Sequence, residues 1–456
     1  MRKNDIVPLQ ITGMTNEGSG VGRFEGMAVF VPLTAVGDVI ECRIVKLQKS
    51  YCYGIIERIV TPSPHRCEPG CGVFSKCGGC AFCHFSYEEE LRVKLDFVRS
   101  SFERIGKLPL LPESILGSEK VEHYRNKAQY PVAMQGGRAI CGFYSRRSHR
   151  VIEQHSCALQ PEVFEGVIGR VMEYVNKNAI PAYDELTGSG ALRHIYLRRG
   201  EHTGQIMLCL VLTSKKYMNV FEGLYEGLVS EYPDIASIVI NLNPKSTNAI
   251  LGREFVTVFG GDTIDDIMCG RRITLSPGSF YQVNTPQAQR LYEKAGEYAG
   301  LSEGEILLDL YCGTGTIGLS LIKDGCRLIG ADIVPSSIEN AKKNALQNGI
   351  ENAEFICADA AQAARLFFER GERPDVIIAD PARKGCDRAT LELMAKMNPK
   401  RIVMISCDHS TAARDLAILR ESGFELTRCE AVDLFPRTAH VECISLMERS
   451  NSDDRA

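Results

Sequence analysis

The sequence predicts an α/β protein of three parts: an N-terminal small β-barrel, a central α+β domain and a C-terminal Rossmann-like domain. Three observations predict this class. The 456 residues exceed what one ordinary hydrophobic core holds. Short β-rich runs separated by glycine turns fill the first sixty residues, which is typical of a small closed barrel. From about Ser279 onward strands alternate with helices, the pattern of a parallel sheet with crossover helices.

The boundaries between these parts follow from breaks in the pattern. The TPSPHR segment interrupts the strand pattern and ends the barrel. Apolar residues at helical spacing then predict a helix over 86–106, and further helices are expected near 163–176 and 218–231 in a strand-rich region. We expect the barrel to span 1–62, the central domain 63–90 and 120–265, and the C-terminal domain 91–119 and 266–456. The tail from about residue 450 looks disordered.

Composition restricts the class of protein. Hydrophobic residues make up 44% of the chain and charged residues 24%, as in soluble globular proteins. No apolar run reaches membrane length and the start lacks a signal-peptide core, so we expect a cytoplasmic protein without a membrane partner. The net charge of -4 argues against a globally basic nucleic-acid binder. Two local basic clusters are either RNA contacts or solvated faces: Arg146, Arg147, His149 and Arg150, and Arg193, His194, Arg198 and Arg199.

Eighteen cysteines are many for a cytosolic protein, and they are unevenly spread. Five of them crowd one short segment: Cys67, Cys71, Cys77, Cys80 and Cys83. In a reducing compartment such crowding indicates ligation of a metal or cluster rather than disulfide bonds.

A glycine-rich loop, LLDLYCGTGTIGL, follows an apolar run and precedes a helix. Glycines there allow a tight turn and let a ligand approach the backbone at a helix N-terminus. A bare GxGxxG does not separate a nicotinamide cofactor from S-adenosylmethionine. Acidic residues after successive strands favour the latter: Asp309 for the methionine moiety, Asp332 for the ribose hydroxyls and Asp359 for the adenine amino group. A structural glycine turn is the alternative.

Three further residues are candidates for the chemistry. Cys407 ends the strand RIVMISC, and Asp380 follows the strand DVIIA, so both should line the crevice at the carboxyl ends of the strands. Cys407 would be a nucleophile if its thiolate is accessible, and a buried structural cysteine otherwise. Glu442, near the start of the last strand, would be a general base or an ordinary edge-strand glutamate. Gln282 is available to a substrate or cofactor, or caps a helix.

With these residues assembled, the chain resembles the RNA 5-methyluridine methyltransferases from about residue 7 to about residue 448. Within them it is most similar to the 23S ribosomal RNA uracil-C5 enzymes. The resemblance implies an OB-like TRAM barrel that binds RNA, on the stretch EGSGVGRFEGMAVFVP, and a SAM-dependent methyltransferase domain. It implies that Cys407 is the nucleophile, Glu442 the general base and Asp380 a contact to an extruded uracil. The cofactor-binding set that it implies comprises Gln282, Asp309, Tyr311, Gly313, Asp332, Asp359 and Asp380.

The resemblance also implies a four-iron, four-sulfur cluster. The segment CGVFSKCGGC matches the family's ligand pattern at Cys71, Cys77 and Cys80, and QHSCALQP supplies Cys157 as the fourth ligand. Zinc is the alternative, although its usual paired CxxC knuckles are absent. Cys67 and Cys83 fall outside the pattern.

The expected enzyme is a monomer that methylates carbon-5 of a uridine in RNA, with 23S ribosomal RNA as the expected substrate. The alternatives are a transfer-RNA T-loop methyltransferase, a radical SAM enzyme, and a non-catalytic iron–sulfur protein that binds RNA or senses redox state. A radical enzyme would normally carry CxxxCxxC, but five residues separate Cys71 from Cys77 here. Three positions depart from the family pattern: DPARKG replaces DPPRKG, Asp332 replaces glutamate, and Asp408-His409 follows the nucleophile. The last departure bears on how the cysteine is activated.

Overall fold

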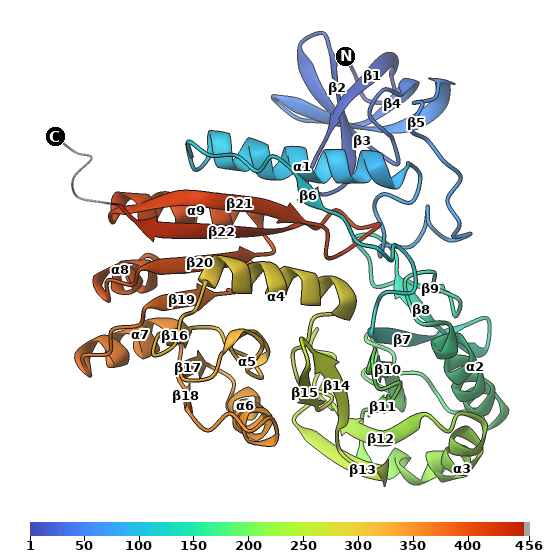
Figure 1. Ribbon diagram of the computed structural model, residues 1–456. Helices are drawn as coiled ribbons and strands as arrows, with labels where there is room; N and C mark the ends of the chain where they lie inside the picture. The colour runs from blue at the N-terminus through green and yellow to red at the C-terminus, as the bar shows by residue number, and fades with distance from the viewer. Residues whose placement is uncertain (451–456) are drawn as a thin grey trace.

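The computed structural model describes residues 1–450, so the predicted disordered tail lies almost wholly outside the described part. Three sheets and one two-stranded hairpin organise the chain, as Figure 1 shows. The prediction of a barrel, a central mixed region and a C-terminal parallel sheet is confirmed at this level. Within residues 1–450, no helix combines the length and the apolar character needed to cross a membrane.

The N-terminal barrel closes in the order β1-β2-β3-β5-β4, with β4 returning to β1. Residues alternate between the interior and the surface along each strand, so Val7, Leu9 and Ile11 enter the core while their neighbours face outward. The bounds are β1 Ile6–Met14, β2 Ser19–Phe24, β3 Met27–Pro32, β4 Val39–Leu47 and β5 Tyr51–Thr61.

The central region is a seven-stranded sheet in the order β13-β12-β11-β10-β7-β8-β9. Helices α2 (Glu162–Lys177) and α3 (Glu222–Glu231) bury their apolar faces on it. The strands are β7 Lys127–Gln135, β8 Arg138–Tyr144, β9 Val151–Glu153, β10 Leu192–Arg199, β11 Ile206–Leu212, β12 Ile235–Leu242 and β13 Glu254–Gly260. Two short 3₁₀ turns, Lys215–Tyr217 and Asn219–Phe221, precede α3 and shorten the predicted helix.

A hairpin of β14 (Ile264–Met268) and β15 (Arg271–Leu275) connects this sheet to the C-terminal one. Ile264 and Ile273 of the hairpin and Met207 of β11 belong to the core of the C-terminal region. The two regions therefore pack together through apolar side chains.

The C-terminal sheet has eight strands in the order β18-β17-β16-β19-β20-β22-β21-β6. All its neighbours are parallel except those of β22, which runs against both β20 and β21. The strands are β6 Ile115–Leu116, β16 Ile306–Asp309, β17 Arg327–Asp332, β18 Ala353–Cys357, β19 Val376–Ala379, β20 Arg401–Ser406, β21 Phe424–Val432 and β22 Glu442–Arg449.

Helices cover both faces of this sheet, so it has two cores. Apolar residues of α4, α5 and α6 fill one core, and those of α1, α7, α8 and α9 fill the other. The helices are α1 Tyr87–Arg104, α4 Thr285–Ala299, α5 Thr316–Leu321, α6 Pro335–Gln347, α7 Ala360–Glu369, α8 Arg388–Lys396 and α9 His409–Glu421.

Helix α1 confirms the predicted amphipathic helix and begins at a capping residue, because Ser86 accepts a hydrogen bond from the Glu89 N–H. It packs on α9, while β6 pairs with β21. Segments before residue 120 thus join the C-terminal sheet, and Figure 1 shows α1 between this sheet and the barrel.

Candidate active site

The predicted catalytic residues converge at one edge of the C-terminal sheet. Asp380 follows β19 and Cys407 follows β20, at the carboxyl ends of two parallel strands. Because β22 is antiparallel, its first residue, Glu442, lies at the same edge. The register pairs Ser406 with Cys443, which places Glu442 across from Cys407 in the adjacent strand. The sheet therefore brings the thiol and the two carboxyl groups together.

Burial and neighbouring negative charges disfavour ionisation of these groups. Burial raises the pKa of Cys407 to about 12, and the negative charges of Glu442 and Asp380 contribute to that rise. Burial and Asp380 raise the pKa of Glu442 well above its usual range, and burial raises that of Asp380 to about 7. Cationic Arg383 acts in the opposite direction on Cys407 and Glu442. Such mutual perturbation in a crevice is typical of catalytic groups.

Glu442 is 2% exposed, and within the described residues its Oε2 has no hydrogen-bond partner. A buried carboxylate oxygen without a partner is costly, so sites that retain one commonly use it on a ligand. The positive charge of Arg383 lowers the pKa of this carboxyl group, and the Arg383 guanidinium is 3.2 Å from Nε2 of His440. The sequence analysis did not assign Arg383 or His440, although both lie in segments that it had singled out.

The glycine-rich loop joins β16 to α5 and is held by acidic side chains. Asp309 accepts a hydrogen bond from the Gly318 N–H at 3.1 Å through Oδ2, while its Oδ1 has no partner within the described residues. Burial raises the pKa of Asp309 to about 7. Gly315 has a φ of 81° and caps α5, a conformation that a glycine adopts without strain. The loop thus presents an unpartnered buried carboxyl oxygen beside a helix N-terminus.

Two further acidic residues at the carboxyl ends of the strands, Asp332 and Asp359, accept hydrogen bonds from backbone N–H groups. Asp332 accepts from the Gly313 N–H at 3.1 Å and from the Val334 N–H at 2.8 Å. Asp359 accepts from the Gln362 N–H at 2.9 Å and so caps α7. The prediction placed Asp332 and Asp359 at the ends of neighbouring strands, and their strands β17 and β18 are indeed adjacent.

Two other predicted cofactor residues have different surroundings. Gln282 is 6% exposed, and its backbone carbonyl oxygen accepts from Asn126 Nδ2 at 2.8 Å. The Tyr311 hydroxyl donates to Cys386 Sγ at 3.5 Å, toward α8. Gln282 therefore belongs to the junction between the central and C-terminal sheets.

The side chains of Asp408 and His409 contact the start of α9 and helix α1. Asp408 caps α9 by accepting from the Ser410 and Thr411 N–H groups. His409 Nδ1 is 2.7 Å from Ser101 Oγ, and its ring lies on Phe97 of α1. This departure from the family pattern serves the packing of α9 on α1.

The four predicted cluster ligands line one hollow of about 120 Å³. Cys71, Cys77, Cys80 and Cys157 share it with the apolar side chains of Val73, Phe74, Phe143 and Leu159. Burial raises the pKa of Cys157 to about 11, and the neighbouring thiols of Cys80, Cys77 and Cys71 add to that rise. Within residues 1–450, no three His, Cys, Asp or Glu side chains are arranged to hold a single metal ion.

One basic cluster is not a solvated face. Arg193 and Arg198 are buried, and their guanidinium groups donate to backbone carbonyls, including that of Ser279 at 2.6 Å. In the other cluster, Arg147 pairs with Glu17 of the barrel at 2.7 Å.

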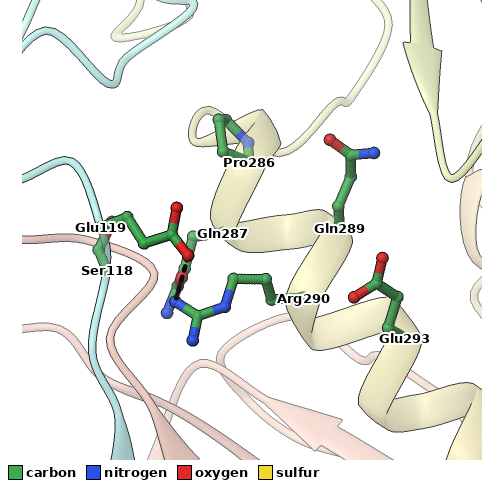
Figure 2. Close-up of a pocket in the computed structure, with 7 residues that line it drawn as sticks. All are labelled: Ser118, Glu119, Pro286, Gln287, Gln289, Arg290 and Glu293. Atoms are coloured by element: carbon green, nitrogen blue, oxygen red, sulfur yellow. Dashed lines mark hydrogen bonds and ion pairs between the residues drawn. The ribbon is translucent and has the colours of Figure 1, made fainter.

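A second hollow, of about 200 Å³, lies beside the N-terminal half of α4. Figure 2 shows Arg290 reaching toward Glu119 and Gln287 within it. None of the predicted catalytic or cofactor-binding residues lines this hollow.

Comparison with known proteins assigns the chain to a family. Residues 267–450 match the family model of tRNA (uracil-5-)-methyltransferase, and residues 2–56 match the TRAM domain. An RNA methyltransferase of Clostridium tetani, itself uncharacterized, is 40% identical over 98% of this chain and 97% of its own length. Another uncharacterized RNA methyltransferase, from Halalkalibacterium halodurans, is 39% identical over 99% of this chain and 98% of its own length. The chain belongs to the RNA uracil-5-methyltransferase family.

A solved structure extends this assignment to the architecture of the enzyme. The tRNA (uracil-54, C5)-methyltransferase of Pyrococcus abyssi, crystallised with S-adenosyl-L-homocysteine, is 25% identical. It superposes with a TM-score of 0.78 over 96% of this chain and 99% of its own. The enzyme therefore shares with it the order of barrel, central sheet and methyltransferase domain, and the prediction of an RNA methyltransferase with a TRAM barrel is confirmed.

Proposed function

We propose that the enzyme methylates carbon-5 of a uridine in RNA with S-adenosylmethionine, through a covalent bond between Cys407 and carbon-6. The observation that carries the proposal is the placement of Cys407 and Glu442 across from each other on antiparallel β20 and β22. Carbon-5 of uracil is too weak a nucleophile to take a methyl group unaided. The ring needs a nucleophile that adds to carbon-6 and a base that removes the proton from carbon-5. A thiol and a carboxyl group placed on either side of the carbon-5–carbon-6 bond can supply these two steps.

The cofactor fits the glycine-rich loop on the evidence of Asp309. Its buried Oδ1 has no partner within the described residues and its pKa is raised, as expected of a carboxylate that waits for a cation. Asp309, Asp332, Asp359 and Gly313, with Gln282 and Tyr311 at the margins, would hold S-adenosylmethionine. When bound, it supplies an electrophilic methyl group. The P. abyssi relative was crystallised with S-adenosyl-L-homocysteine, the demethylated product of this cofactor, which supports S-adenosylmethionine as the cofactor.

In the proposed mechanism the target uridine is extruded from its RNA into the crevice, at a cost of a few kcal/mol. The Asp380 carboxylate accepts a hydrogen bond from the ring N3–H. The Cys407 thiolate bonds to carbon-6, and the electron pair of the ring double bond becomes available at carbon-5, which would take the methyl group and leave S-adenosylhomocysteine. Glu442 then removes the proton from carbon-5, the carbon–sulfur bond breaks, and the double bond re-forms as the thiolate leaves.

Two substitutions test this mechanism. Cys407→Ala should abolish formation of 5-methyluridine, since no other group adds to carbon-6, while binding of S-adenosylmethionine is retained. Glu442→Gln should accumulate an RNA–protein adduct that survives denaturation on a gel, because elimination needs the proton removed. Turnover by Cys407→Ala would rule out the covalent step. The absence of any adduct with Glu442→Gln would remove Glu442 from the role of base.

We further propose that Cys71, Cys77, Cys80 and Cys157 hold a four-iron, four-sulfur cluster. Four thiols from two distant segments line one hollow together with apolar side chains and with Arg125, Gln154 and Gln160, and four thiols suit a cluster with four cysteine ligands.

Measurement of iron and sulfide distinguishes an iron–sulfur cluster from a zinc site. Anaerobically purified enzyme should carry about four iron atoms per chain and absorb visible light. Cys157→Ser should lose most of this iron, whereas Cys67→Ser should keep it, because Cys67 is exposed and lies outside the hollow. Zinc in place of iron would contradict the proposal.

For the RNA target we propose 23S ribosomal RNA, with the enzyme acting as a cytoplasmic monomer. One chain already carries the nucleophile, the base and the cofactor loop, so the chemistry does not need a second subunit. Transfer RNA is the second candidate, favoured by the full-length likeness to a tRNA (uracil-54, C5)-methyltransferase. The division into residues 1–62, 63–90 with 120–265, and 91–119 with 266–456 also remains a proposal.

A further inference from the structure

A fully buried lysine joins α1 to the segment that precedes Glu442. Lys94 is 0% exposed, and its ammonium group donates to Glu90 Oε1 and to Asp433 Oδ1, each at 2.7 Å. It also donates to the Phe435 carbonyl at 3.1 Å. Asp433 and Phe435 belong to residues 433–441, which connect β21 to β22 and which we name the catalytic loop.

The same loop is fastened at further points by this group of charges. The Tyr87 hydroxyl of α1 donates to Asp433 Oδ2 at 2.7 Å, and the Asp433 N–H donates to the Leu116 carbonyl of β6 at 3.0 Å. Glu90 Oε1 accepts from the Arg437 N–H at 2.6 Å. Arg437 has a φ of 67°, which is uncommon for a residue other than glycine, so these contacts hold the backbone in a strained conformation.

The loop also contacts the cysteine-rich segment directly. The Arg437 carbonyl accepts from the N–H groups of Ala81 at 2.8 Å and Phe82 at 3.0 Å, immediately after Cys80. The loop thus lies between α1 on one side and the cysteine-rich segment on the other, and it leads straight into Glu442.

The energetic cost of burying these charges indicates that Lys94 fixes the conformation of the catalytic loop and does not only stabilise the fold. Burying three charges costs several kcal/mol per ion, and the attraction between them repays this only in a well-satisfied arrangement. An apolar helix–loop contact would stabilise the fold at least as well. A network that forms only in one loop conformation, by contrast, fixes that conformation, and loss of about 1 Å in placement can reduce a catalytic rate on the order of 100-fold.

We propose that Lys94 is a positioning residue: it fixes the catalytic loop so that the Glu442 carboxyl group faces the carbon-5 proton beside Cys407. This inference rests on the proposed function. It predicts a defect confined to the step that Glu442 performs, whereas addition of Cys407 to carbon-6 continues.

The test compares Lys94→Met with Glu305→Gln in full-length enzyme. Glu305 is also buried and pairs with Arg401 at 2.7 Å, but it lies at the opposite edge of the same sheet, before β16 and beside the start of β20. Both variants break an ion network beside the C-terminal sheet: the Lys94 network is fully buried, and the Glu305 network includes the exposed Lys400. Steady-state kcat and KM for RNA, the melting temperature and the fraction of enzyme in denaturation-resistant RNA adduct are measured below the melting temperature of each.

Lys94→Met should lower kcat on the order of 100-fold, leave KM for RNA nearly unchanged and raise the adduct fraction above wild type. Glu305→Gln should lower the melting temperature without raising the adduct fraction. An adduct fraction in Lys94→Met no higher than in Glu305→Gln overturns the inference. If Lys94→Met does not fold, Tyr87→Phe decides, since it removes the hydroxyl that donates to Asp433 and accepts from the Ser118 N–H; an adduct fraction at the wild-type level then overturns the inference.

Wild-type enzyme run in parallel separates the two proposals. Failure of wild type to form 5-methyluridine in uridine-containing RNA would refute the proposed function, and the inference with it. An active wild type with a normal Lys94→Met variant would refute the inference only.

Discussion

At the scale of single residues, the site of this methyltransferase contains acidic groups whose pKa values are raised by burial. Asp309 and Asp380 both have their pKa raised to about 7 by burial, and the Cys407 thiol has its pKa raised to about 12. The free enzyme therefore holds little thiolate at neutral pH. Arg383 is the cation whose charge lowers the pKa of Cys407 and Glu442, which gives it a part in forming the nucleophile.

These values predict a pH dependence. Asp380 must be ionised to accept from the uracil N3–H, so kcat/KM should fall as the pH drops through about 7, the folded-state pKa of that carboxyl. The rate should continue to rise above that pH, because the thiolate fraction of Cys407 grows toward its pKa of about 12. A pH–rate profile of wild type and Asp380→Asn checks this. The variant should be slower and should lose the inflection near neutrality; an unchanged inflection would assign it to another group.

The sequence predicted individual residues better than their partners. Cys407, Glu442 and Asp380 could be found because each stands next to a strand end in a recognisable segment, and the sheet register then brought them together. The network of Lys94 could not be found in this way, since Lys94 and Asp433 are 339 positions apart and the lysine occupies an apolar-looking helix face. His409 shows the converse, because a histidine beside the nucleophile turned out to contact α1.

At the scale of elements, periodicity located the helices and strands, and turn chemistry set their ends. Helix α1 begins after Ser86 as its capping serine requires, whereas the helix expected from residue 218 begins at Glu222, because a 3₁₀ turn replaces its first residues. Sequence pattern alone does not give the strand order. The insertion of β22 between β20 and β21 depends on packing contacts between distant segments.

At the scale of the whole molecule, the architecture that the enzyme shares with the P. abyssi relative does not determine which RNA it methylates. If 23S ribosomal RNA is the target, a strain that lacks the gene should lose 5-methyluridine at one or more positions of that RNA and keep it in transfer RNA. Mapping of 5-methyluridine in both RNA classes measures this. Complementation with wild type should restore the modification and Cys407→Ala should not; loss confined to the T-loop of transfer RNA would instead establish the second candidate.

The position of β22 has a consequence for biosynthesis. Its neighbours β20 and β21 are both translated earlier, yet neither can pair with the other, because residues 442–449 must come between them. While the ribosome is still making this segment, the growing polypeptide already contains Cys407 but neither a finished sheet nor Glu442. Under the proposed mechanism, the thiol therefore gains its partner carboxyl group only when synthesis of β22 completes the sheet.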